Sequence, residues 1–154
     1  MANPVLLFDD KYTLLNANIH VLDYIIGRRL NNSLAEQGTT LNQTVVLAYI
    51  LKNKGMNVTQ RNLESFMDLK NPSITSLVQT MVRKELIYRE PNPNDKRSHY
   101  LRLTEKGLDA VDPGMRNIIE VSEKFYSILT DEDVEDLLRI FGKLIPDKNF
   151  KDQV

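Results

Sequence analysis

The sequence contains no cysteine and only two histidines. A chain without cysteine forms no disulfide, no zinc–thiolate site and no thiol redox switch. His20 and His99 are far apart, and neither lies in a group of side chains spaced like metal ligands. We therefore expect no metal and no cofactor.

Long apolar runs are missing as well. The uninterrupted ones span a few residues, far fewer than the ~20 that a membrane-spanning helix needs. The N-terminal stretch MANPVLLFDDK has no basic segment followed by a long apolar one, so it does not resemble a secretory signal. We expect a cytoplasmic protein that does not bind a membrane.

The signatures of common enzymes are also absent. The sequence has no glycine-rich phosphate loop and no nucleophile accompanied by a matched base. The carboxylates at Asp131–Asp133 and Glu135–Asp136 are numerous, but they fit a helix start and a solvated helix face. We predict that the protein is not an enzyme, and we assign no catalytic residue.

Charge is spread unevenly over the 154 residues, which suffice for one well-buried core. The net charge is −1 overall, and it divides into −1 for residues 1–51, +5 for residues 52–106 and −5 for residues 107–154. A basic middle between neutral and acidic ends is typical of a nucleic-acid-binding face on a soluble protein.

The basic middle begins with two short helical patterns joined by a tight turn. Thr59 is a suitable N-cap for a helix over Gln60–Met67. After the turn at Asp68–Lys70, Asn71 and Pro72 predict the next helix, with Asn71 as its cap and proline at its first position. This order predicts a helix-turn-helix.

The second of these helices has one apolar and one polar face. Its inward residues are predicted to be Ile74, Leu77, Val78, Met81 and Val82. Its outward residues are small or hydrogen-bonding, as a helix in the DNA major groove requires: Ser73, Thr75, Ser76, Gln79, Thr80 and Arg83. A plain solvated face is the alternative, but no acidic residue lies between Lys70 and Lys84, where an ordinary exposed helix would mix charges.

Two strand-like runs follow, Leu86–Glu90 and Ser98–Leu103, and they flank a polar loop that contains two prolines. Lys96 and Arg97 lie in this loop, and an arginine at a loop tip suits the negative potential of a narrow minor groove. Asp95 is expected to orient the Arg97 guanidinium. A surface hairpin with an ion pair explains these residues equally well.

Apolar residues at three- and four-residue steps predict further helices on both sides. Their ranges are Asp9–Ala35, Asn42–Asn53, from Glu105 onward, and from Thr130 to Pro146. Pro113 predicts a kink or a restart in the third of these. The outer helices have more apolar face than one small domain covers, so we predict a shared dimer core, with buried core helices as the alternative. Residues 1–8 are expected to form an arm that packs on a partner.

These residues resemble the MarR family of bacterial winged-helix transcription regulators. The resemblance rests on four stretches: Gln43 before VVLAYI, TQRNL from Thr59, SITSLVQTMVRKELI from Ser73, and NPNDKRSHYLRLTEKG from Asn92. The last contains Asp95-Lys96-Arg97 as the family's D-x-R element. Its position between two strands and before LTEKG makes this short motif specific.

The resemblance implies a mainly α fold with a small β-hairpin wing, in one domain over residues 1–154. Residues 40–104 would form the winged helix-turn-helix, and residues 9–36 and 105–146 an α-helical dimerisation region. It also implies a homodimer that binds a double-stranded, pseudo-palindromic DNA operator, in which Ser73, Thr75, Ser76 and Arg97 contact DNA. A repressor that responds to an aromatic small molecule is expected, with the following residues at the effector site: Ile19, His20, Asp23, Tyr24 and Tyr49. Core or dimer-interface packing is the alternative for each of these five.

The sequence departs from the family pattern at four positions. Asp68 and Glu85 stand where the family has glycine, at positions that need positive φ. Glu64 stands where alanine is common, and Ser76 where arginine is frequent. We expect these departures to change the operator and the affinity more than the fold.

A helical adaptor that binds proteins is the alternative function, because an apolar helix stripe serves a foreign partner as well as a second copy. An adaptor would be monomeric and indifferent to duplex DNA. A regulator would be a dimer and would bind DNA.

Overall fold

Six helices and one two-stranded sheet make up residues 10–145, the part of the chain that the computed structural model describes. They form two compact units, which divide between Val121 and Ser122. The expected N-terminal arm and the chain from Pro146 onward lie outside the described residues. No helix within residues 10–145 is both long and apolar enough to cross a membrane.

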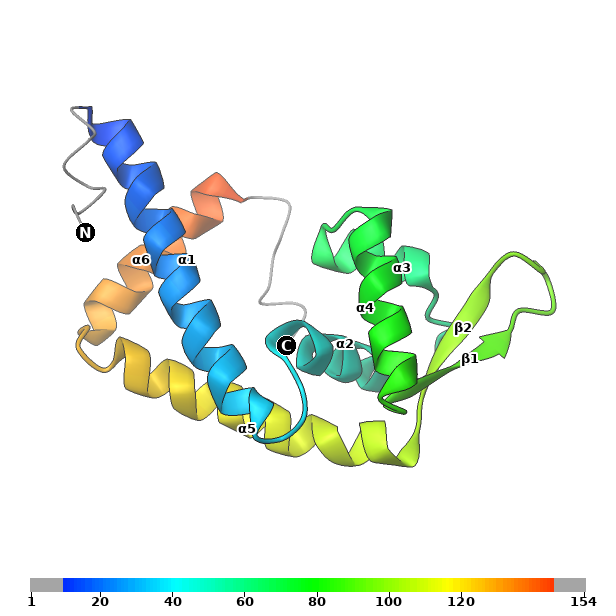
Figure 1. Cartoon of the computed structure of the whole chain (residues 1–154). Coiled ribbons are helices and arrows are strands. Elements are labelled where there is room, and N and C mark those ends of the chain that lie inside the picture. The colour runs from blue at the N-terminus through cyan, green and yellow to red at the C-terminus, as the bar shows by residue number, and fades with distance from the viewer. Residues whose placement is uncertain (1–9, 146–154) are drawn as a thin grey trace. The chain divides into compact units, whose positions relative to one another are not determined.

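The first unit contains both strands and most of the helices. Its elements are α1 (Lys11–Ala35), α2 (Leu41–Lys52), α3 (Gln60–Met67), α4 (Asn71–Arg83), β1 (Ile87–Pro91), β2 (His99–Leu103) and α5 (Glu105–Tyr126) as far as Val121. Asp10 caps α1 by accepting from Tyr12 and Thr13, and the hydrogen bond from the Thr13 hydroxyl lowers the pKa of Asp10. The expected fold, mainly helical with a hairpin wing, is confirmed (Figure 1).

One apolar core holds this unit together. Its buried residues come from α2, α3, α4, both strands, α5 and the segments before α3 and β1: Val46, Leu47, Ile50, Val58, Leu63, Ile74, Val78, Met81, Leu86, Ile87, Leu101 and Val111. The inward face predicted for α4 is confirmed, since Ile74, Val78 and Met81 are buried and Leu77 and Val82 pack against the core. A fully buried side chain of this size contributes roughly 1.5–3 kcal/mol to folding. The position of α4 is therefore fixed by its buried side.

The hairpin is an antiparallel pair with Arg89 opposite Leu101 and Glu90 opposite Tyr100. Its inward face contains the buried Ile87 and Leu101. On the other edge of β2, the Leu101 N–H donates to the Val58 carbonyl at 2.8 Å. The base of the wing is therefore joined to the segment that leads into α3.

The end of α4, the start of the wing and the start of α5 meet at the Leu86 carbonyl. This oxygen accepts from the Thr104 N–H at 3.2 Å, and it shares the proton of the Thr104 hydroxyl, 3.1 Å away, with the Glu85 carbonyl, which lies 2.6 Å from that hydroxyl. Gly107 packs directly against it, so that a methyl group on Gly107 would lie 1.9 Å from the oxygen. Only glycine fits there without moving the backbone.

The prediction of a restart at Pro113 is wrong, because α5 continues through this residue as one helix. Proline lacks the N–H that would donate to the preceding turn, and the exposed Asp109 leaves the freed carbonyl close to water. The helix ends at Tyr126, so Ile128 lies outside it and is 88% exposed.

The second unit contains the end of α5 and α6 (Asp131–Leu144). The helix start expected from the carboxylates at Asp131–Asp133 is confirmed: Thr130 accepts from the Asp133 N–H, and the Asp133 carboxylate accepts from the Thr130 N–H and hydroxyl. The hydrogen bond from the Thr130 N–H lowers the pKa of Asp133, and the bond from the Thr130 hydroxyl lowers it to a smaller degree. No residue of α6 is buried, and its apolar residues Leu138, Phe141 and Leu144 are exposed.

We predict that Gly107→Ala lowers the free energy of unfolding by about 3 kcal/mol, since the new methyl group meets a backbone carbonyl that is fixed by two hydrogen bonds. Denaturant titration followed by circular dichroism would measure the change. Gly55→Ala is the matched control, because nothing lies within 4 Å of the added methyl group. Equal stability of the two variants would contradict the close approach.

Candidate nucleic-acid interface

The tight turn between α3 and α4 depends on a left-handed residue. Thr59 forms a capping box with Asn62 at the start of α3, and the helix ends at Asp68, whose φ is 54°. The predicted positive φ of Asp68 is confirmed, and so is that of Glu85, whose φ is 58° at the end of α4. Aspartate tolerates this region better than glutamate, which bears a cost of about 1–2 kcal/mol.

The expected cap of α4 is wrong by one residue. Lys70 is the N-cap and makes no capping hydrogen bond, Asn71 is the first helical residue and Pro72 the second. The Asn71 side chain is instead used between helices, where its Nδ2 donates to Glu64 Oε1 at 2.8 Å. This bond explains how Glu64 is accommodated where the family has a small residue.

A short chain of hydrogen bonds follows from Asn71 along the polar side of α4. The Thr75 hydroxyl donates to Asn71 Oδ1 at 3.2 Å and accepts from Gln60 Nε2 at 2.7 Å. Thr75 is therefore half-buried and already paired. Gln60, Glu64 and Asn71 were not predicted as members of the polar face, because their partners lie up to fifteen residues away along the chain.

The remaining outward residues of α4 are accessible. Ser73, Ser76, Gln79 and Arg83 are exposed, and Thr80 is half-buried where its hydroxyl accepts from Arg83 Nη2 at 3.1 Å. No acidic residue occurs in α4. The helix itself thus offers hydroxyl, amide and guanidinium groups, and the carboxylate that α3 contributes to this face, that of Glu64, is hydrogen-bonded to Asn71.

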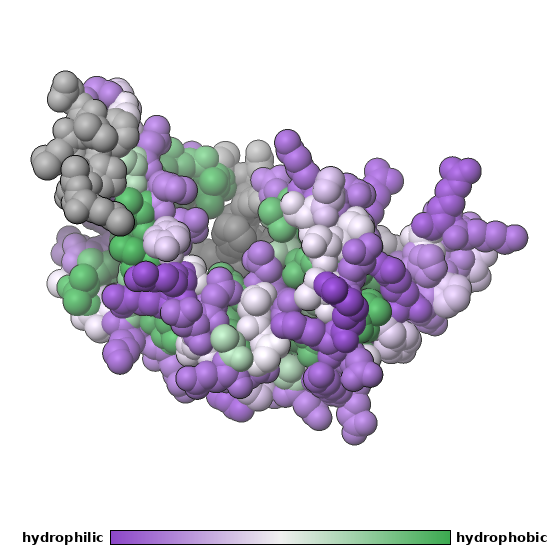
Figure 2. Space-filling model, viewed as in Figure 1, coloured by the Kyte–Doolittle hydropathy of each residue, from purple (hydrophilic) through white to green (hydrophobic). Residues whose placement is uncertain are grey.

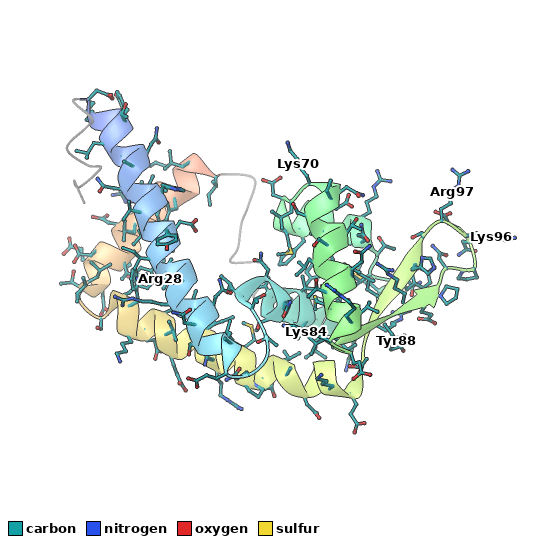
Figure 3. All side chains as sticks on the ribbon, in the orientation of Figure 1. Arg28, Lys70, Lys84, Tyr88, Lys96 and Arg97 are labelled. Carbon is teal, nitrogen blue, oxygen red and sulfur yellow. The ribbon has the colours of Figure 1, made fainter. Side chains whose placement is uncertain are left out.

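Lys96 and Arg97 are exposed in the loop between β1 and β2, and Figure 3 shows both projecting from the tip of the wing. Lys70 at the start of α4 projects toward the same side as Arg97. Asp95 does not contact the Arg97 guanidinium; its Oδ1 accepts from the Arg97 backbone N–H at 2.9 Å. Asp95 therefore shapes the loop backbone, and the Arg97 side chain extends into solvent.

The lysine at the other end of α4, Lys84, has a structural role. Lys84 Nζ donates to the Gly38 carbonyl at 2.9 Å and to Gln43 Oε1 at 3.0 Å, and Gln43 is buried. In Figure 3 Lys84 lies at the end of α4, away from the wing tip. Periodicity does not reveal this lysine, because its partners are more than forty residues away.

The five expected effector residues fall into two groups. Ile19, His20, Asp23 and Tyr24 are exposed on α1, whereas Tyr49 is half-buried on α2 and stacks on Phe66 with ring centroids 4.2 Å apart. A cavity of about 270 Å³ lies at the base of the wing, between the end of α2, β2 and the start of α5, and none of the five expected effector residues lines it.

Within residues 10–145, no group of three or more His, Cys, Asp or Glu side chains is placed to hold a metal ion.

Hydrophilic side chains cover the wing loop, as the space-filling view shows (Figure 2). Together with the acid-free side of α4 and the tight α3–α4 turn, this arrangement defines a winged helix-turn-helix, the class of protein that binds double-stranded DNA. Comparison with known proteins makes the assignment narrower.

A family model described as MarR family matches residues 39–99. The uncharacterized HTH-type transcriptional regulator YdcH of Bacillus subtilis (strain 168) is 32% identical over 103 residues, which cover 65% of this chain and 69% of YdcH. The chain belongs to the MarR family of transcription regulators.

Two further proteins agree with this assignment. The HTH-type transcriptional repressor MdtR of Bacillus subtilis (strain 168) is 28% identical over 112 residues, which cover 73% of this chain and 71% of MdtR. The crystal structure of a mutant MarR from E. coli complexed with operator DNA has a TM-score of 0.77 and 26% identity, over 86% of this chain and 94% of that one. These relatives are regulators and not enzymes, and the adaptor alternative is not favoured.

Proposed function

We propose that the protein is a homodimeric repressor that binds a pseudo-palindromic DNA operator through α4 and the wing. The observation that carries this proposal is the acid-free outward side of α4 beside the exposed cations of the wing loop. Phosphate attracts such a surface irrespective of sequence, while the side chains that reach base edges supply specificity. Residues 40–104 form the DNA-binding region in this proposal.

In the proposed complex, α4 enters the major groove with its N-terminal half nearest the bases. Ser73 and Ser76 are exposed there, Gln79 is exposed on the next turn, and their hydroxyl and amide groups suit base edges. Arg83 and the half-buried Thr75 and Thr80 complete the proposed contact set on this helix. Two such helices related by a dyad would enter major grooves about 34 Å apart.

The wing supplies the second contact in the proposal. Arg97 would enter the minor groove beside the half-site, where the negative potential is strongest if the groove is narrow. Lys96 would contact the neighbouring phosphates. Asp95 supports this role by fixing the loop backbone at Arg97.

The apolar faces of the outer helices support a homodimer. In the first unit, α1 buries only Leu30 and Leu34, and its exposed large apolar residues include Leu15, Ile19 and Leu22. In the second unit, α6 buries none of its residues. A second copy of the chain, packed on residues 9–36 and 105–146, would remove these faces from water.

Repression and control by an effector are the finer parts of the proposal. MdtR is named as a repressor, which supports the same direction of control for this chain. Exposed apolar and titratable groups alternate on α1 at Ile19, His20, Asp23 and Tyr24, a composition that suits an aromatic acid once a second copy or a closing movement covers it. Tyr49 would border the same site.

We expect Arg97→Ala to weaken operator binding about tenfold or more and to reduce the slope of log affinity against log salt by about one for each wing that binds. Titrating a duplex that the wild-type protein has selected from a random-sequence pool would measure both. Arg116→Ala, which removes an exposed cation on α5, is the control and should bind like the wild type. Unchanged affinity of Arg97→Ala would exclude the proposed role of the wing.

We expect Leu138→Glu to shift the protein from dimer to monomer, because the new carboxylate would have to be buried in the proposed dimer core. Leu138 is 58% exposed in the single chain, so the monomer should still fold. Sedimentation velocity would measure the mass, with Glu135→Gln on the same helix as the control. A wild-type protein that sediments as a monomer would refute the dimer.

A panel of aromatic carboxylic acids tests the effector. Ligand that binds the folded state raises the melting temperature, and Tyr24→Ala should abolish that rise if α1 lines the site. Lys52→Ala, which changes an exposed residue outside the proposed site, should leave the rise intact. If no acid at millimolar concentration stabilises the protein, an aromatic acid effector is ruled out.

A further inference from the structure

Arg102 has unusual surroundings for a residue on the outer face of the wing. The register places Arg102 opposite Tyr88 on β1, next to the pair of Tyr100 and Glu90, and this face points away from the core residues Ile87 and Leu101. Its side chain is nevertheless only 25% exposed. A long cation on an outer face stays this covered only when specific partners hold it.

The Arg102 guanidinium contacts two separate parts of the chain. Its Nε donates to Glu90 Oε2 at 2.5 Å within the wing. Its Nη1 donates to the Met56 carbonyl at 3.2 Å, and its Nη2 to Asn57 Oδ1 at 2.7 Å, both in the segment that leads into α3. Arginine suits this geometry because its donors diverge from one rigid plane.

The contacts continue from Arg102 toward the wing tip. Its guanidinium lies over the Tyr100 ring, 5.4 Å from the centroid. The Tyr100 hydroxyl donates to Asn92 Oδ1 at 2.8 Å, and the same oxygen accepts from the Asn94 N–H at 2.9 Å. The chain of contacts thus reaches the loop whose Asp95 fixes the backbone of Arg97.

The backbone alone secures only the base of the hairpin. Val58 and Thr59 pair with β2 at Leu101 and Tyr100, and beyond Tyr100 the wing is two strands and a loop. An isolated two-stranded hairpin is marginally stable in water, so its outer half needs side-chain support to keep one orientation.

We propose that Arg102 is a positioning residue for DNA binding, which clamps the wing to the segment before α3 and so holds Arg97 at a fixed place relative to α4. The proposal rests on the proposed function of Arg97 as a DNA contact. Holding Arg97 in place before binding removes the entropic cost of ordering the wing on the operator. Arg102 itself acts through the wing and does not touch DNA.

Two variants break the clamp in different ways. Arg102→Lys keeps the charge but cannot reach Glu90, Met56 and Asn57 together, and Asn57→Ala removes one anchor without changing the wing. Arg89→Ala is the matched control, since it removes an exposed arginine from β1 for which the described residues provide no ion pair. Melting temperatures establish that each variant folds.

Hydrogen–deuterium exchange of the free protein tests the clamp without DNA. Amides of residues 92–98 should exchange at least about fivefold faster in Arg102→Lys and Asn57→Ala than in the wild type or in Arg89→Ala, while amides of α4 should be unchanged. Exchange that stays at the wild-type rate in both clamp variants would overturn the proposal.

A double-mutant cycle with Arg97→Ala then tests the link to DNA, using the duplex that the wild-type protein selects. If Arg102 acts through Arg97, the variant Arg102→Lys/Arg97→Ala should bind about as weakly as Arg97→Ala alone. Arg89→Ala, which leaves the clamp intact, should instead change the affinity by the same factor in the wild type and in the Arg97→Ala background. If the losses of affinity caused by Arg102→Lys and Arg97→Ala multiply in the double variant, the proposed coupling is overturned, but the DNA-binding role of Arg97 stays intact. If Arg97→Ala alone has no effect, the proposed function of the wing fails, and the exchange experiment still decides whether the clamp exists.

Discussion

Helix α4, the wing and helix α5 are joined at the carbonyl of Leu86. Helix α4 has just ended, β1 of the wing begins at the next residue, and α5 returns to the same oxygen through Thr104 and Gly107. A hydrogen-bonded backbone group in a close-packed site has almost no freedom to shift. Helix, wing and connecting helix therefore start from one rigid joint.

Two lysines strengthen this joint from outside the core. Lys106 Nζ donates to the Lys84 carbonyl at 2.7 Å, and Lys84 in turn reaches Gly38 and the buried Gln43 at the start of α2. Positive charge at the end of α4 also complements the partial negative charge of the helix C-terminus. Part of the excess positive charge of residues 52–106 thus stabilises the winged helix-turn-helix and is not available for DNA.

Short-range patterns predicted most of the fold, because each rests on residues that are neighbours in the chain. The bounds of α3, the N-cap at Thr59, the start of α6 after Thr130 and the inward face of α4 all follow from spacing over a few residues. Family resemblance added the positive φ of Asp68 and Glu85, which composition alone does not indicate. The restart that Pro113 suggested does not occur, because α5 continues through this residue.

The candidate site was predicted less completely than the fold. The residue types on α4 and the wing loop indicated an interface. However, Asn71 was expected to cap α4 and instead bonds Glu64, and Asp95 was expected to bond the Arg97 guanidinium and instead accepts from the Arg97 backbone N–H. Arg102 has two of its partners about 45 residues away, and no local pattern distinguishes it from any other exposed strand arginine. Side-chain networks of this kind depend on tertiary structure and emerge only from coordinates.

The hydrogen bonds of Thr75 restrict the bases that this residue could contact in the proposed complex. Its hydroxyl proton is given to Asn71, and one of its lone pairs receives Gln60. A purine nitrogen or a thymine oxygen can take that proton only by displacing Asn71, which is itself tied to Glu64. In the proposed complex, the helix would therefore favour at this position a base that donates a hydrogen bond or offers a methyl group over a base that only accepts.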